Sequence, residues 1–437
     1  MTAADVRVPH ARLIVIAGAT AAGGALLWLT RTYTFYFDEW TFITSAPDWT
    51  FITYFEPHNE HPSILFRLVY AGLLNTIGLR SYAPYMAVLL ATHFANGVLL
   101  FELVRRRAGD LIGLSAAALL LVLGAGWEDL LWAFQMAWLA SVALGLGALL
   151  ALETRRHAWL TSLLLAASLA FSGIGVAFAT AIAVALVFTP TRRRELLWLV
   201  PVGVAVLAWY VAFGRFGSHP NPQPTAANLL IDPAYAVWGL SQGAAGLIGV
   251  GGYVALPLLV APFGALAWRW RRHGVDATSS GVLVGLGVFY LVAGLTRAQL
   301  GWQQSGASRY VYVGAVLWLI LLADAARGLP WRGTWRPALA ACLFLACFNS
   351  GVLLFEFVAA KTVQMQRATA DLQALAAERS DPCLDPTGSA DPLILPFVTP
   401  PGYYRAIDRY DDPVAGRPVT DMADFQAALA NLRKRGC

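Results

Sequence analysis

Residues 13–40 have the sequence LIVIAGATAAGGALLWLTRTYTFYFDEW, an apolar run followed by aromatic residues and an acidic pair. The apolar part, 13–30, is long enough for a helix that crosses the ~30 Å hydrocarbon core of a bilayer. It carries no small-residue cleavage site, so it predicts a retained membrane helix rather than a signal peptide. Similar runs recur as far as Phe357, so nearly the whole chain is predicted to be membrane domain.

The composition agrees with this interpretation. Of the 437 residues, 58% are hydrophobic and 13% are charged, whereas soluble domains average about 25% charged residues. The net charge of +5 comes from short arginine clusters between apolar runs, where the positive-inside rule places them. The sequence therefore predicts an all-α polytopic membrane protein that does not bind nucleic acid.

The arginine clusters also predict the topology, because arginine-rich loops stay in the cytoplasm and the chain between two such loops crosses the membrane and returns. This parity predicts a bundle of about eleven transmembrane helices in the bacterial inner (plasma) membrane. The N-terminus would be cytoplasmic and the C-terminus extracytoplasmic. The clusters lie at 105–107, 155–156, 192–194, 269–272 and 327–336. The predicted spans are 12–30, 84–104, 111–126, 130–152, 158–170, 174–189, 195–213, 252–269, 281–297, 310–326 and 337–357.

Three apolar segments are ambiguous. Segment 62–79 would move the cluster 105–107 to the outside if it crossed, so we expect an interfacial helix on the outer membrane face. The same parity predicts that 228–250 is an external or re-entrant element. The stretch 158–189 has basic residues on both flanks and predicts two short helices, broken at 172–175. Broken helices at membrane depth occur where protein or a water-filled cavity surrounds them.

The chain is predicted to have two parts. Residues 1–357 form the transmembrane domain, in which 31–83 is the first extracytoplasmic loop. Residues 358–437 form a small extracytoplasmic C-terminal region that begins with a helix. This region contains Cys383 and Cys437, and a disulfide between them is chemically allowed outside the cytoplasm.

The polar residues of the predicted outer loops concentrate after the first span. Asp38 and Glu39 directly follow an apolar stretch, so they should lie near the membrane surface. Ionisable groups at that depth are costly and tend to be functional. The alternative is a helix cap, but acids at the carboxy end of a helix oppose its dipole. We therefore expect a catalytic pair, with Asp38 or Glu39 as the base.

The same loop contains Glu56-Pro57-His58-Asn59-Glu60-His61-Pro62. We expect His58, Glu60 and His61 to contact the acceptor or another substrate. Imidazole and carboxylate groups are also suitable ligands for a divalent metal, although the spacing matches no specific metal motif. A polar loop that only orders itself is the third alternative.

A second acidic pair, Glu128-Asp129, lies in the short link between two predicted spans. By parity it is at the outer mouth of these spans, on the same side as Asp38. Short turns collect acidic residues, so a solvated turn and a substrate-binding role are both open. Trp132 and Trp138 nearby are typical of interfacial anchors.

Arg297 and Arg309 lie in a predicted outer loop, against the positive-inside trend. An arginine fork binds phosphate bidentately, so we expect these two residues, with Tyr310, to bind a phosphate. Gln303 in the same loop is a candidate substrate ligand. The alternative is that the arginines only touch lipid headgroups.

These clusters together fit one chemical step. A sugar linked to a lipid phosphate has a leaving group that stays anionic. Its transfer needs a group that binds the phosphate and a carboxylate base for the acceptor hydroxyl. Arg297 and Arg309 supply the first, and Asp38 or Glu39 supplies the second.

The order of these elements resembles the GT-C superfamily of membrane glycosyltransferases, which includes protein O-mannosyltransferases and lipid A aminoarabinose transferases. The matching elements are Asp38-Glu39 after the first span, His61-Pro62 at the start of the interfacial helix, and the run 84–107. Ser308-Arg309-Tyr310 resembles the late-span arginine that those enzymes use for the lipid phosphate. The family's usual second proline after His-Pro is Ser63 here, which marks a divergent branch.

The resemblance implies that 1–357 is a GT-C-like catalytic domain, with Asp38 as general base and inversion at the anomeric carbon. The implied donor is a polyprenyl-phosphate sugar, and the implied acceptor is a cell-envelope glycan, lipid or protein. Some relatives use a divalent metal and others do not. Abundant arginine and alanine, with lysine only at Lys361 and Lys434, resemble actinobacterial membrane proteins.

Two other functions stay open. A transporter or flippase of lipid-linked sugars would also need outer arginines and a cavity, but no carboxylate base. It would be favoured by inverted repeats, of which the sequence shows no sign. A non-catalytic subunit of an envelope-assembly complex would make Asp38 dispensable.

Overall fold

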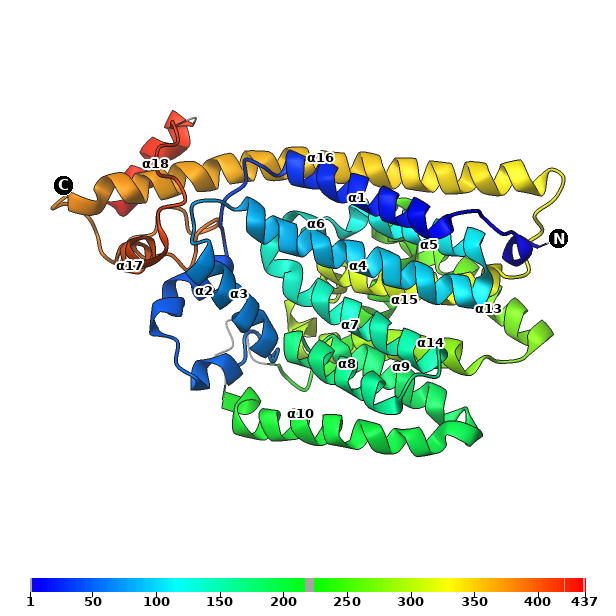
Figure 1. The fold of residues 1–437 in the computed structure, drawn as a ribbon. Coiled ribbons are helices and arrows are strands. Elements are labelled where there is room, and N and C mark those ends of the chain that lie inside the picture. Colours follow the sequence, from blue (N-terminus) through cyan, green and yellow to red (C-terminus); the bar gives the residue numbers. More distant parts are fainter. Residues whose placement is uncertain (1, 217–223, 420, 435–436) are drawn as a thin grey trace.

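The computed structural model describes residues 2–216, 224–419, 421–434 and 437. Throughout these ranges the regular secondary structure is helical, and they contain no β-strand. Most of the helices run roughly parallel in one elongated bundle (Figure 1). The prediction of an all-α fold is therefore confirmed.

Eight helical segments in the described ranges are long and apolar enough to cross a membrane. Helices suit this role because their backbone polar groups bond within the segment, where lipid offers no partners. The chain is thus a multi-pass membrane protein. The main helices of these segments are α1 (Ala11–Leu29), α4 (Ala83–Ala108), α7 (Met136–Glu153), α10 (Val200–Ala212), α13 (Val260–His273), α14 (Ala277–Arg297), α15 (Ser308–Ala326) and α16 (Trp335–Ala377).

Three shorter apolar helices correspond to the other predicted spans. They are α5 (Asp110–Leu121), α8 (Ala158–Phe171) and α9 (Gly175–Val187). Each has only 12–14 residues, which is shorter than the eight segments that are long enough to cross. Among the described residues the count of eleven spans therefore stays a prediction. The predicted break at 172–175 is confirmed, because α8 ends and α9 begins there.

The remaining helices lie mostly at one end of the bundle. α3 coincides with the predicted interfacial helix at 62–79. α11 lies within the segment predicted to be external or re-entrant, but it packs against α14 and α15 as part of the bundle. These helices are α2 (Glu39–Ser45), α3 (Ile64–Thr76), α6 (Glu128–Leu131), α11 (Asn228–Ala245), α12 (Ala255–Leu258), α17 (Pro400–Tyr410) and α18 (Met422–Leu432).

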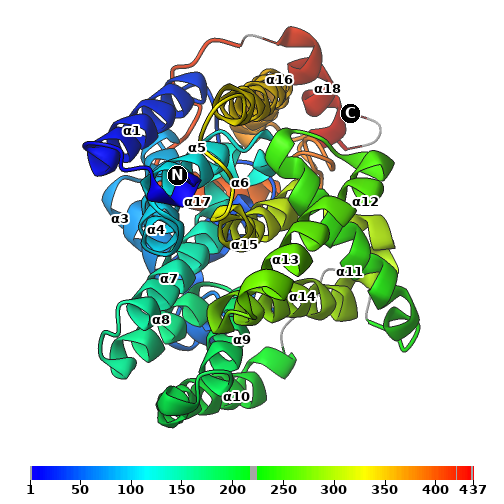
Figure 2. The same ribbon diagram turned by 90° about the vertical axis from the view of Figure 1, so that its right-hand side faces the viewer.

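The arginine clusters lie at the opposite end of the bundle, near the N-terminus (right in Figure 1). The cluster 105–107 lines one depression there with Arg327, and Arg107 also pairs with Glu153 and Asp276. Figure 2 looks along the bundle from this end and shows α15 near the centre and α10 at the periphery. The clusters that were predicted to share one membrane side therefore share one end.

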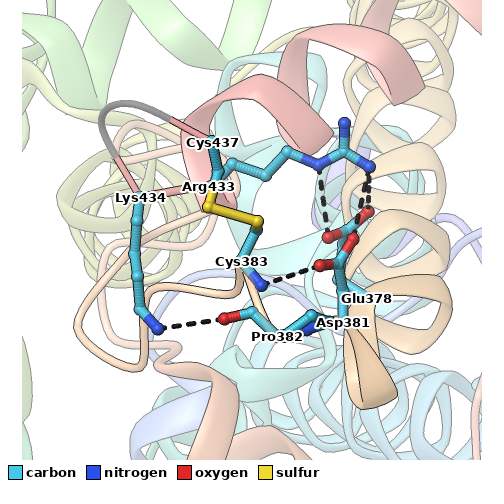
Figure 3. Close-up of a disulfide and its surroundings, with 7 residues drawn as sticks. All are labelled: Glu378, Asp381, Pro382, Cys383, Arg433, Lys434 and Cys437. Carbon is cyan, nitrogen blue, oxygen red and sulfur yellow. Dashed lines mark hydrogen bonds and ion pairs between the residues drawn. A yellow bond between two sulfur atoms is a disulfide. The ribbon is translucent and has the colours of Figure 1, made fainter.

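α16 continues through the predicted boundary at 357/358 and has 43 residues. The predicted C-terminal helix is thus present, as an extension of the last span. Beyond it, Cys383 and Cys437 form a disulfide with a Cα–Cα distance of 5.8 Å (Figure 3). Beside the disulfide, Arg433 pairs with Glu378 at 3.0 Å, so residues near the chain end are fixed to the C-terminal end of α16.

Candidate functional site

The acidic pair after α1 divides between two environments. Asp38 is half-buried and lines a cavity of about 370 Å³, called here the central cavity. Glu39 is 0% exposed. Its carboxylate accepts hydrogen bonds from the Tyr82 hydroxyl at 3.0 Å and the Tyr36 amide at 3.1 Å. The Tyr82 hydroxyl also accepts from the Ala133 amide at 2.9 Å, so Glu39 joins three segments, and only Asp38 faces the cavity.

The two carboxyl groups also differ in acidity. Burial raises the pKa of Asp38 to about 6, against the opposing effect of Arg309 and Arg297. Burial raises the pKa of Glu39 to about 8, against the hydrogen bonds from Tyr36 and Tyr82. At neutral pH Asp38 is therefore mostly ionised and Glu39 mostly protonated. Of the two acids that the sequence left open, only Asp38 is both mostly ionised and part of the lining of the central cavity.

The backbone beside the central cavity is strained. Phe37, Asn59 and Glu60 have φ angles of 53°, 46° and 66°. Left-handed conformations of such residues cost of order 1–3 kcal/mol and concentrate at functional sites. The Phe37 amide donates to the Ile394 carbonyl at 3.0 Å, which helps to hold the turn that presents Asp38.

The two predicted phosphate-binding arginines line the same cavity as Asp38. Arg297, at the end of α14, donates to Tyr310 Oη at 2.9 Å and to Glu60 Oε2 at 2.8 Å. Arg309, in the first turn of α15, donates to Glu128 Oε1 at 3.2 Å. Its Nε is buried and, within the described ranges, lacks a hydrogen-bond acceptor. The structure thus brings the two arginines together with Tyr310, which the sequence grouped with them, and also with Glu60 and Glu128.

His58 and His61 also line the central cavity. Burial, together with nearby arginine charge, lowers the pKa of both to about 3, so both are neutral at physiological pH. His61 Nδ1 accepts from the Gly173 amide at 3.3 Å. A Cβ atom at position 173 would lie 2.9 Å from that nitrogen, so the glycine allows the break between α8 and α9 to approach the loop.

The possible metal set of His58, Glu60 and His61 is not assembled. Glu60 is paired with Arg297, and His61 Nδ1 already accepts from the backbone. Among the residues that the structure describes, no group of three His, Cys, Asp or Glu side chains is placed to hold a metal ion. The described geometry therefore does not support the metal alternative for these residues, and contact with a substrate stays a prediction.

Two predicted substrate ligands lie elsewhere. Gln303 is exposed and donates to Tyr253 Oη at 2.9 Å, while its neighbour Gln304 lines the central cavity. Asp129 is 0% exposed, and in the described structure neither carboxylate oxygen has a hydrogen-bond partner. Burial raises the pKa of Asp129 well above its usual value. The positions favour Gln304 over Gln303, and they place Asp129 in the protein interior rather than in the lining of the central cavity.

The sequence analysis did not identify several residues that line the cavity. Trp132 and Trp138, interpreted as interfacial anchors, are part of its wall, and Phe397 comes from the C-terminal region. No sequence signal distinguishes Phe397. Arg67, which lines an adjoining cavity, did have one, because it is the single charged residue of an otherwise apolar helix.

Two further cavities adjoin the central one. The loop cavity, about 410 Å³, shares Asp38, His58 and Phe397 with it and extends to Arg67. The apolar cavity, about 290 Å³, shares Arg297 and is otherwise lined mainly by apolar side chains of α8, α9, α10 and α14. Asp38 thus lies where the central and loop cavities meet, and Arg297 lies where the central and apolar cavities meet.

The chain matches no protein-family model, no curated protein and no solved structure. The resemblance to GT-C enzymes therefore rests on short motifs and their order along the chain. The structure adds that Asp38, His61 and Arg309, one from each of three matching motifs, line a single cavity.

Proposed function

We propose that the protein is a glycosyltransferase that moves a sugar from a polyprenyl-phosphate donor to an acceptor, with Asp38 as general base. The observation that carries this proposal is the place of Asp38 at the junction of two cavities, of which one contains Arg297 and Arg309. A donor and an acceptor can then reach the same carboxylate from two different spaces.

The donor fits the central and apolar cavities together. Arg297 and Arg309 give the central cavity two guanidinium groups for a phosphate. The apolar cavity begins at Arg297 and suits the first isoprene units of a lipid, because its walls are mostly hydrocarbon. Tyr310 and Glu60 hold Arg297 at this junction.

The chemistry follows from this arrangement. The acceptor hydroxyl gives its proton to the Asp38 carboxylate while its oxygen bonds to the anomeric carbon. The bond from that carbon to the phosphate oxygen breaks, and its electron pair leaves with the lipid phosphate, which the guanidinium groups stabilise. Attack opposite the leaving group inverts the anomeric centre. A base with a pKa of about 6 is ionised at neutral pH and still accepts a proton.

The same proposal includes the orientation in the membrane. The arginine clusters lie at the end opposite the cavities, which by the positive-inside rule supports cavities on the extracytoplasmic side of a bacterial plasma membrane. The disulfide in residues 358–437 fits an oxidising compartment. The acceptor would then be a component of the cell envelope.

The test is transfer by purified protein in lipid nanodiscs, with a panel of radiolabelled polyprenyl-phosphate sugars and an envelope-glycan acceptor. Wild type is compared with Asp38→Asn, Arg309→Ala and the control Asp48→Asn. Asp48 is an exposed carboxylate of the same loop that pairs with Arg405. Loss of transfer in Asp38→Asn, with donor binding intact and Asp48→Asn active, is expected.

Two outcomes would contradict the proposal. One is transfer that is indifferent to Asp38→Asn, and the other is donor binding by wild type without transfer. If the bound donor instead crosses the bilayer without transfer, the protein is a transporter of lipid-linked sugars.

A further inference from the structure

The loop cavity is separate from the side that would hold the donor phosphate. Its walls come from the loop after α1 and from α3, and it shares Asp38 with the central cavity. Thr41, Ser45 and Thr53 line it, as does Trp49. It therefore combines hydroxyl groups with a flat apolar surface next to the base.

Arg67 is the distinctive residue of this cavity. It is 7% exposed although it comes from a short apolar helix. Its guanidinium carbon lies 4.8 Å from the centre of the Phe42 ring and 5.4 Å from that of Trp49, and one amino group donates to the Glu56 carbonyl at 3.4 Å. Its Nε is buried, and no residue of the described structure accepts from it. The buried Nε is not open to a ligand, but Arg67 lines the loop cavity, and the amino groups of its guanidinium can donate to an oxygen of a ligand there.

The lining charges distinguish the two cavities. The central cavity has two arginines and Asp38, so it attracts an anion. The loop cavity has Arg67 together with two carboxylates, Asp38 and Glu56, so an anionic ligand would be repelled. A neutral sugar fits this set, because its hydroxyl groups both donate to carboxylates and accept from a guanidinium. The ring of Trp49 can cover the apolar face of the sugar.

We infer that the loop cavity binds a neutral sugar residue of the acceptor, held by Arg67 and Trp49 so that one hydroxyl reaches Asp38. The acceptor is then a neutral glycan rather than a lipid or a protein side chain. The role of this sugar as acceptor rests on the proposed function, but its binding to the cavity does not.

Binding is tested first, on the full chain in nanodiscs without donor, by saturation-transfer NMR. The probes are the methyl glycosides of mannose, glucose and arabinofuranose, with the methyl glycoside of glucuronic acid as their anionic counterpart. Wild type and Arg309→Ala should bind at least one neutral glycoside equally well. Arg67→Gln and Trp49→Ala should bind it at least about tenfold more weakly. Arg67→Lys, which keeps the charge but lacks the guanidinium fork, should also bind it weakly. Thermal unfolding verifies that each variant is folded.

Three binding results would overturn the inference. Glycoside binding that survives in Arg67→Gln and Trp49→Ala but is lost in Arg309→Ala would place the sugar in the central cavity. Tighter binding of the glucuronic acid glycoside would contradict a neutral ligand. Binding of none of the neutral glycosides would contradict a sugar site.

The transfer assay then separates this inference from the proposed function. With a neutral oligosaccharide acceptor, Arg67→Gln should raise the acceptor KM about 10- to 100-fold and leave the donor KM within about twofold. Glycoside binding that depends on Arg67, without any transfer, would contradict the proposed function and support the sugar site. Transfer to a lipid or peptide acceptor at a rate that Arg67→Gln does not change would contradict the sugar site and support the proposed function.

Discussion

The two ends of the bundle use arginine in different ways. At the arginine-rich end, Arg107 is 9% exposed at its side chain and pairs with both Glu153 and Asp276. At the cavity end, Arg309 pairs with Glu128 at 3.2 Å and lines the central cavity together with Asp38. The first arginine joins two acids, and the second lies with a half-buried acid at the wall of a cavity. The surroundings of an arginine, and not its charge alone, therefore separate structural arginines from candidate functional ones.

The sharpest test of this difference is to neutralise one acid at each end. Asp38→Asn should lower transfer about 10²- to 10⁴-fold, the usual contribution of a general base, without loss of donor binding. Glu153→Gln, at the arginine-rich end, should leave the transfer rate per folded molecule unchanged. Initial rates with one radiolabelled donor measure both. Equal losses in the two variants would show that the ends do not differ in function.

The next effect concerns the donor phosphate. Arg309→Ala removes a charge-assisted contact and should raise the donor KM about 10- to 100-fold. Arg106→Ala is the matched control, because Arg106 is half exposed and pairs with Glu102 at the other end. Titration of the donor in the transfer assay gives both constants. A donor KM that is unchanged in Arg309→Ala would exclude this residue from phosphate binding.

The pH profile should show an effect of about tenfold. Asp38 acts as a base only when ionised, and its pKa of about 6 means that kcat/KM should rise about tenfold between pH 5 and pH 7. Glu39→Gln should keep this inflection, because the pKa of Glu39 is raised to about 8 and glutamine resembles its protonated form. If Glu39→Gln instead shifts or abolishes the inflection, the base is Glu39 and not Asp38.

The smallest effect on activity is expected at the arginine-rich end. Arg107→Gln leaves Glu153 and Asp276 without their shared partner, which should cost about 1–3 kcal/mol of stability, a reduced value because both acids are partly exposed. Thermal unfolding in nanodiscs measures the loss, and the transfer rate per folded molecule should stay the same. If Arg107→Gln has normal stability but impaired transfer, the arginine-rich end has a functional role and not a structural one.

The sequence predicted most of the helices, because long apolar runs and arginine clusters are local signals of membrane spans. It also offered Asp38, Arg297, Arg309 and His61 as candidate site residues, and all four line the central cavity. It could not separate Asp38 from Glu39. That choice depends on the partner Tyr82, which is distant in the sequence and takes up the Glu39 carboxylate.

Two other features depend on the folded chain in the same way. Gln304 lines the central cavity and Gln303 does not. This difference between neighbouring positions depends on the short helical turns on either side of Gly301. Phe397 reaches the cavity because the C-terminal region folds back onto the loop after α1, where its ring lies 5.7 Å from that of Phe37. Neither arrangement leaves a pattern in the local sequence.

The length of α16 has a mechanical consequence. Its 43 residues measure about 65 Å at ~1.5 Å per residue, roughly twice the ~30 Å thickness of the hydrocarbon core. Only about half of the helix can therefore lie in the hydrocarbon core, and its C-terminal part packs against the region that contributes Phe397 to the central cavity. A mismatch between a helix and the bilayer can be relieved by tilting, within the limits that packing against neighbouring helices sets. A tilt of α16 would move one wall of the central cavity, which would couple the site to bilayer thickness.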